Sequence, residues 1–210
     1  MSSVVRRMPF ALGAMAVLLI PLRAGCAEPP IERPLFVYII EGAPLAASAD
    51  AHIKKAVEIW ETAGIAFKPK VQMISGKQVK ELLGEDRKLQ SYAGEGDRET
   101  EPGYTERKAL AKLRANPKSL AVFFVSTNWM SRAEPELFQV YVDSESGLTP
   151  TGRTMAHEIG HLLLGPGHTG KPGVPWKSGL MENAGTPNDS VDIDASDAAI
   201  ARKRAEMIPK

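Results

Sequence analysis

The segment His157–His161, with the sequence HEIGH, constrains the fold more than any other part of this chain. Apolar side chains recur at helical spacing through and beyond it, at Met155, Ile159, Leu162 and Leu163. This period predicts an amphipathic helix that starts at Thr149-Pro150 and runs to Leu164. Residues i and i+4 lie on one face of a helix, so the two imidazoles can reach one metal ion.

A third histidine and a glutamate complete the pattern of a zinc site. Zinc sites that catalyse hydrolysis have three protein ligands and an open fourth position. His168 follows His161 by seven residues, after Gly165-Pro166-Gly167, a break that can turn the chain back toward the metal. Neutral imidazole suits Zn²⁺, and Glu158 stands where a carboxylate can act as a general base. We therefore expect His157, His161 and His168 to bind one catalytic zinc ion.

The segment HEIGHLLLGPGH, residues 157–168, resembles the zinc-binding motif of the metzincin zinc metallopeptidases, in a reduced, matrixin-like form. Gly179-Leu180-Met181 is similar to the methionine turn of that family. The resemblance implies an α+β fold, with a mixed twisted β-sheet, a long N-terminal helix, an active-site helix, a Met-turn and a C-terminal helix. It also implies that Glu158 is the general base and that Met181 is the methionine of the turn.

The motif departs from the family pattern in its spacing. Three residues, Leu162 to Leu164, separate the second histidine from Gly165, where the family has two. One extra residue turns a helix by about 100°, so we expect the helix to unwind early or bulge for His168 to reach the metal. Glu182, 21 residues beyond His161, is the alternative third ligand. The chain has no acidic, glycine-rich loop, so no structural calcium is expected.

Periodicity also outlines the rest of the chain. It predicts strands over residues 35–40, 65–74 and 120–125, a short edge strand over 139–142, and helices over 48–63 and 196–207. Two further helical patterns, around 77–90 and 105–115, lie in a charged stretch over 76–118. His52 is expected on the solvent side of the first long helix. An extended peptide substrate could pair with the predicted edge strand.

Residues 1–27 have the order of a secretory signal peptide, with Arg6-Arg7, then an apolar run over 9–22, then small residues up to Ala27. We expect cleavage after Ala27, which leaves a single zinc metallopeptidase-like catalytic domain over 28–210 without cysteine or a transmembrane span. An alternative is a lipoprotein signal that ends before Cys26, which would anchor the chain to a lipid. The mature protein is therefore expected to be secreted or periplasmic.

The remaining 23 basic and 25 acidic side chains form no basic stripe, so nucleic acid is not an expected partner. The expected function is a secreted zinc-dependent endopeptidase, which hydrolyses peptide bonds through a zinc-activated water with Glu158 as general base. Its partner is then a peptide or protein substrate. Two alternatives stay open at this point: a non-catalytic zinc-binding domain that serves an envelope or partner protein, and a zinc amidase that acts on a non-peptide substrate.

Overall fold

A computed structural model of the chain describes residues 28–85, 88–89, 103–114, 116–127, 131–143, 151–182 and 190–210. The predicted signal peptide over 1–27, including Cys26, lies outside the described residues. None of the described helices combines the length and the apolar character that crossing a membrane requires.

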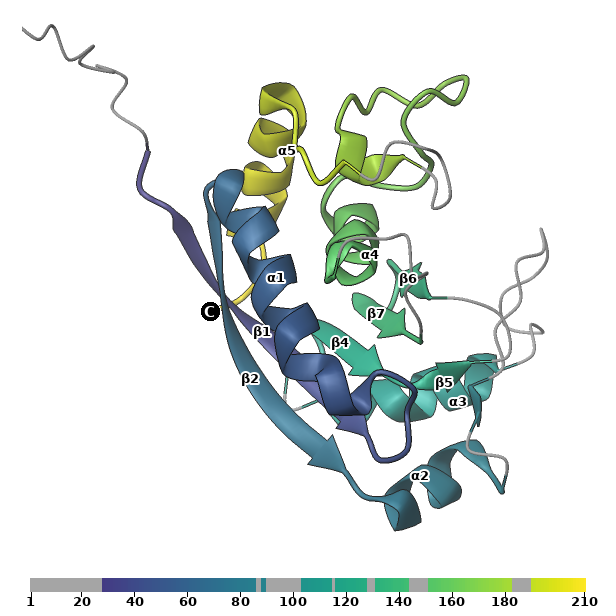
Figure 1. Ribbon diagram of the computed structural model, residues 1–210. Helices are drawn as coiled ribbons and strands as arrows, with labels where there is room; N and C mark the ends of the chain where they lie inside the picture. The colour runs from purple at the N-terminus through teal and green to yellow at the C-terminus, as the bar shows by residue number, and fades with distance from the viewer. Residues whose placement is uncertain are drawn as a thin grey trace, which may run out of the picture.

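A five-stranded, mostly parallel sheet forms the centre of the molecule (Figure 1). Its strands, in spatial order, are β2 (Ile65–Ile74), β1 (Ile31–Ile40), β4 (Leu120–Phe124), β7 (Gln139–Val142) and β6 (Arg132–Glu134). Only β6 runs antiparallel to its neighbour, with Ala133 opposite Val140. Two short strands, β3 (Lys88–Leu89) and β5 (Ser126–Thr127), pair separately.

The prediction of an edge strand over 139–142 is wrong. All four residues of β7 are buried, and the strand lies between β4 and β6. The edge is β6, whose sequence Arg-Ala-Glu carries no hydrophobic pattern, and it joins the sheet through a short reversal after Glu134. The alternation of apolar and polar residues cannot reveal such a strand, because three residues are too few to show a period of two.

Helices cover both faces of the sheet, which makes the fold a mixed α/β arrangement. On one face lie α1 (Ala49–Thr62), α4 (Arg153–Leu163) and α5 (Ala195–Glu206), and on the other α2 (Gly76–Leu83) and α3 (Tyr104–Ala111). Successive side chains of β1 point to opposite faces of the sheet, so this strand contributes to the cores on both sides. Leu35 and Val37 belong to the core beneath α1 and α4, whereas Tyr38 and Ile40 belong to the core beneath α2 and α3.

Close packing of α1 against α4 positions the HEIGH segment, residues 157–161. The Trp60 side chain is fully buried, and its Nε1 donates to the Ala156 carbonyl at 3.1 Å. A Cβ at Gly160 would make only an ordinary contact of 3.6 Å with the Trp60 ring, but it would lie 2.4 Å from the Met181 sulfur. The glycine of HEIGH therefore leaves room for the Met181 side chain.

His52 is buried rather than on the solvent side of α1, which corrects the prediction. Its exposed fraction is 6%, and its Nδ1 accepts a hydrogen bond from the Gly152 N–H at 3.3 Å. The start of α4, with Gly152 as the residue before its first turn, covers this part of α1. The burial of His52 arises from a segment 100 residues away, so the pattern of α1 alone did not reveal it.

We expect Gly152→Ala to lower the free energy of unfolding by about 2–3 kcal/mol. Gly152 has φ +78°, and an added Cβ would meet the His52 carbonyl at 2.7 Å and the Ala56 nitrogen at 2.9 Å. Backbone atoms cannot move aside as a side chain can. Gly42→Ala is the matched control, because Gly42 has φ +84° and open space around it. Urea denaturation of both variants tests this, and equal losses would contradict the steric explanation.

Candidate metal centre

The structure brings the three predicted histidines together. His157 and His161 project from successive turns of α4, and His168 comes from the loop that follows this helix. One ligand nitrogen from each ring lies within 4.8 Å of the other two. Among the described residues this is the group that could hold a metal ion, and it includes neither Glu158 nor Glu182. The alternative third ligand, Glu182, is therefore not part of the cluster.

Backbone carbonyls orient the rings of His157 and His161. The Nδ1 atom of His157 lies 2.6 Å from the Leu180 carbonyl, and that of His161 lies 3.2 Å from the Gly165 carbonyl. A carbonyl can only accept, so each Nδ1 carries the proton and each Nε2 has a free lone pair. The two Nε2 atoms are 3.1 Å apart. This is close to the roughly 3.4 Å between two nitrogens bound to one tetrahedral zinc ion.

The electrostatics of the cluster favour neutral rings. Burial, with a further contribution from His161, lowers the pKa of His157 to about 3. Burial lowers the pKa of His161 to about 4, and burial followed by the charge of Lys171 lowers the pKa of His168. Neutral imidazole is the form that binds a metal ion. The donor set and its geometry thus fit a zinc ion.

The turn after α4, rather than a bulge within it, accommodates the extra residue of the motif. The helix runs to Leu163, and the N–H of Leu164 still donates to the Gly160 carbonyl at 2.7 Å. Gly165 and Gly167 then reverse the chain with φ angles of +125° and +93°. A Cβ at Gly167 would lie 2.5 Å from Val174, so only glycine fits there. His168 reaches the cluster through this glycine pair.

Glu158 lies at the boundary between α4 and the edge strand. Its exposed fraction is 8%, and burial raises the pKa of its carboxyl group to about 8. A hydrogen bond from the Ala133 backbone and the charge of Arg132, both on β6, oppose this rise. The carboxyl group is thus held against the strand that forms the sheet edge. Its pKa near neutrality is suited to proton transfer.

The predicted Met-turn segment forms a short 3-10 helix, η3 (Gly179–Met181), in contact with α4. Two carbonyls of η3 make contacts with the loop and the helix. The Leu180 carbonyl is the partner of His157, and the Met181 carbonyl accepts a hydrogen bond from the Thr169 N–H at 2.9 Å. Met181 is fully buried, with its sulfur against Gly160. The structure therefore places Met181 directly against the helix that carries two of the histidines.

Two buried charged residues near this turn, Arg153 and Asp197, were not predicted from the sequence. Each is at most 2% exposed. Arg153 stands one helical turn before His157, a position that the amphipathic pattern could have flagged as an arginine on a buried face. Asp197 carries no comparable signal, because an acidic residue in the first turn of a helix is ordinary.

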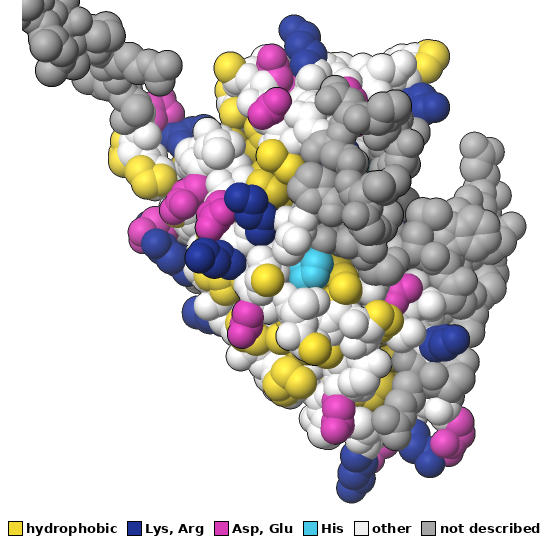
Figure 2. Space-filling model, viewed as in Figure 1, with side chains coloured by type: hydrophobic (Ala, Val, Ile, Leu, Met, Phe, Trp, Pro, Cys, Tyr) yellow, Lys and Arg dark blue, Asp and Glu magenta, His cyan; other side chains and the backbone are white. Residues whose placement is uncertain are grey.

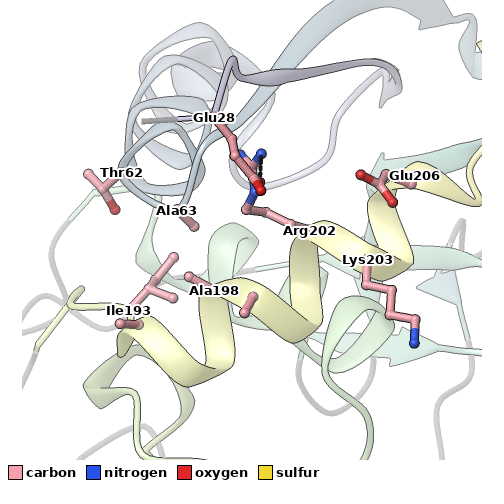
Figure 3. Close-up of a pocket in the computed structure, with 10 residues that line it drawn as sticks. Glu28, Thr62, Ala63, Ile193, Ala198, Arg202, Lys203 and Glu206 are labelled. Atoms are coloured by element: carbon pink, nitrogen blue, oxygen red, sulfur yellow. Dashed lines mark hydrogen bonds and ion pairs between the residues drawn. The ribbon is translucent and has the colours of Figure 1, made fainter. Parts of the chain in front are cut away.

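Figure 2 shows that histidine side chains form only one small patch on the face of the molecule in view. A separate cavity of about 590 Å³ lies between α5, the end of α1 and the start of the described chain (Figure 3). Arg202 crosses it, donating to the Glu28 carboxylate at 2.9 Å and to the Gly64 carbonyl at 2.7 Å. Its lining contains no histidine, so it does not belong to the metal centre.

Comparisons with known proteins bear on the fold. No protein-family model and no curated protein matches this chain. Among solved structures, archaemetzincin from Methanopyrus kandleri matches with a TM-score of 0.50 and 14% sequence identity, over 83% of this chain and 96% of that chain. The fold is similar to that of archaemetzincin. The expectation of a metzincin-like fold is confirmed to this extent.

We expect zinc affinity to fall by no more than about 25-fold between pH 7 and pH 5, the effect that one ordinary imidazole would have. Two imidazoles with the ordinary pKa near 6.5 would each lose roughly 25-fold in their neutral fraction over this range. His157 and His161 stay neutral, because protons compete with a metal only below their lowered pKa values. Competition titration with a chelator measures this, in Glu158→Gln so that the carboxyl group does not titrate. A loss of 100-fold or more would contradict the prediction.

Proposed function

We propose that this protein is a zinc-dependent endopeptidase. The observation that supports the proposal most strongly is the convergence of the His157, His161 and His168 rings, with two Nδ1 atoms bonded to backbone carbonyls. A zinc ion held there would supply a Lewis acid and an acidified water for hydrolysis. Glu158 is the general base in this proposal, and Met181 the methionine of the turn.

Glu158 would accept a proton from the attacking water and deliver it to the leaving amine. Burial raises the pKa of this carboxyl group to about 8 in the metal-free protein, and the positive charge of a bound metal ion would lower it again. A pKa near the working pH lets one group both take up and release a proton. The hydrogen bond from the Ala133 backbone keeps the carboxyl group in place for both.

The outer edge of β6, which pairs with no further strand among the described residues, is where an extended substrate would align. This strand contacts α4 and contains Ala133, which bonds to Glu158. An extended peptide can add to a sheet edge through backbone hydrogen bonds, which leaves side-chain pockets to set specificity. β6 thus replaces the interior strand β7 as the proposed site of substrate pairing.

The experiment combines metal analysis with substrate profiling of the purified full chain. We expect one zinc ion per chain, cleavage of a peptide library, loss of cleavage with a chelator and recovery when zinc is restored. Cell-wall amides and small acyl amides form parallel arms of the assay. Zinc binding without cleavage of any substrate would support a non-catalytic domain, and cleavage confined to the amide arms would support an amidase. Absence of stoichiometric zinc would overturn the proposal as a whole.

We also propose that residues 1–27 are an export signal and that the mature, secreted or periplasmic protein is the single domain 28–210. The order of basic, apolar and small residues supports this. N-terminal sequencing of the protein from the cell exterior should then begin at Glu28. Recovery in the membrane fraction, with a lipid on Cys26, would support the lipoprotein alternative instead.

A further inference from the structure

A buried carboxylate holds one side of the turn that contacts the metal centre. Asp197, in the first turn of α5, is 1% exposed. Its Oδ2 accepts hydrogen bonds from the backbone N–H groups of Lys177 and Ser178, both at 2.8 Å, and from the Ser178 hydroxyl at 2.6 Å. Three bonds to one ionised oxygen form a strong anchor, because charge-assisted hydrogen bonds are stronger than neutral ones.

A buried guanidinium holds the other side of the same turn. Arg153, in the first turn of α4, is 2% exposed. It donates to the carbonyls of Gly179 at 3.4 Å, Glu182 at 3.1 Å and Ser190 at 3.1 Å. The anion thus binds N–H groups and the cation binds carbonyls, so each charge meets the matching end of the peptide dipoles. The segment from Ser178 to Glu182 is fixed between two helices.

This segment in turn holds two of the three histidines. The Leu180 carbonyl is the partner of the His157 Nδ1 atom at 2.6 Å. Thr169, the residue after His168, donates its N–H to the Met181 carbonyl at 2.9 Å and its hydroxyl to the Ser178 carbonyl at 2.8 Å. His161 depends on a different partner, the Gly165 carbonyl.

We propose that Arg153 and Asp197 are positioning residues that set the orientation of His157 and the placement of His168 through the segment Ser178–Glu182. Burial of a charge is costly unless the charge is fully hydrogen-bonded. Charged groups hold the carbonyls and N–H groups of this turn more strongly than neutral side chains would, because charge-assisted hydrogen bonds are stronger. The longer spacing before His168 increases the need for this support, because the ligand lies on a loop and not on the helix. The role in metal binding rests on the proposed zinc site.

The test uses Arg153→Met and Asp197→Asn in the full chain. We expect the dissociation constant for zinc to rise about 10–100-fold, the range typical for loss of a group that orients a metal ligand. In the metal-free protein, the ring nitrogen resonances of His157 and His168 should shift, while those of His161 should not. A purely stabilising role would move neither the zinc affinity nor the ring signals selectively.

Arg33→Met is the matched control. Arg33 is also a buried arginine that donates to backbone carbonyls, those of Ala205 at 2.7 Å and Glu206 at 2.9 Å, but it lies on β1. We expect Arg33→Met to lower the melting temperature while zinc affinity stays at the wild-type value. Arg153→Lys keeps the charge with a single donor group, and we expect it to restore part of the affinity that Arg153→Met loses.

Two results would overturn the positioning role. One is wild-type zinc affinity in both Arg153→Met and Asp197→Asn. The other is an equal loss of affinity in Arg33→Met, which would indicate general loosening. If Arg153→Met fails to fold, Asp197→Asn and Arg153→Lys carry the test. A wild-type protein that binds no zinc would instead defeat the proposed function, and the ring resonances would then still decide whether the two residues orient His157 and His168.

Discussion

Replacement of Glu158 by glutamine is expected to reduce kcat for peptide hydrolysis by about 10²–10⁴-fold, the usual contribution of a general acid–base group. Glutamine has nearly the same shape as glutamate and can still accept the hydrogen bond from the Ala133 backbone, but it cannot take up a proton. Zinc content should therefore stay at the wild-type value, and the melting temperature should not fall, because burial already disfavours the ionised form of Glu158. Steady-state kinetics on a cleaved library peptide, with zinc measured on the same sample, checks both expectations.

Glu58→Gln is the control for the loss of a carboxylate elsewhere. Glu58 lies on the exposed side of α1, where it pairs with Lys55 at 3.0 Å. This variant should have wild-type kcat and KM. Activity of Glu158→Gln within threefold of wild type would contradict the assignment of the general base and would favour a site that only binds metal.

The second large effect is expected at the buried ion pair between α3 and the sheet edge. The Nε atom of Arg107 lies 3.2 Å from the Glu134 carboxylate, and both side chains are 1% exposed. Arg107→Met removes one of the two cations that lie near this buried carboxylate, and loss of one member of a buried ion pair typically costs about 3–5 kcal/mol. Arg132, whose Nη2 lies 3.7 Å from the same oxygen, should keep the loss near the lower end of that range. Urea denaturation measures the change.

The double variant Arg107→Met, Glu134→Leu tests whether the buried charge of Glu134 causes this loss of stability. Removal of both charges puts two apolar side chains in contact, so we expect most of the lost stability to return. A double variant as unstable as Arg107→Met would show that packing, and not the loss of a cation beside the carboxylate, causes the loss of stability. Since Glu134 lies next to Ala133 on β6, Arg107→Met should also weaken peptide binding, with KM rising more than kcat falls.

Helices and strands that have a clear local sequence pattern were predicted correctly. The strand over 65–74 was predicted with the bounds that β2 has, and the first and last long helices were predicted to within one residue at each end. The first helix has an apolar stripe at helical spacing, whereas the last helix was recognised from the acidic residues before it and the basic residues in its C-terminal half. The charged stretch was less well predicted, since α2 and α3 are each eight residues long.

The errors occurred where a distant segment decides the environment of a residue. The neighbours Lys54 and Lys55 favoured a surface position for His52, but the start of α4 covers this side chain. The strand over 139–142 reads as an edge because it is short, but β6 pairs with it on the outer side. Neither covering segment has a pattern that points to its target.

The sequence alone placed two imidazoles and a carboxylate on one helix, because HEIGH lies within an apolar pattern of helical period. It also indicated His168 as the third member. The contacts that hold His168 beside the other two came from the tertiary structure, since the next residue, Thr169, bonds to Ser178 and Met181 in a later turn. Burial of the rings, which lowers the pKa values of the histidines, likewise depends on packing that no local pattern encodes.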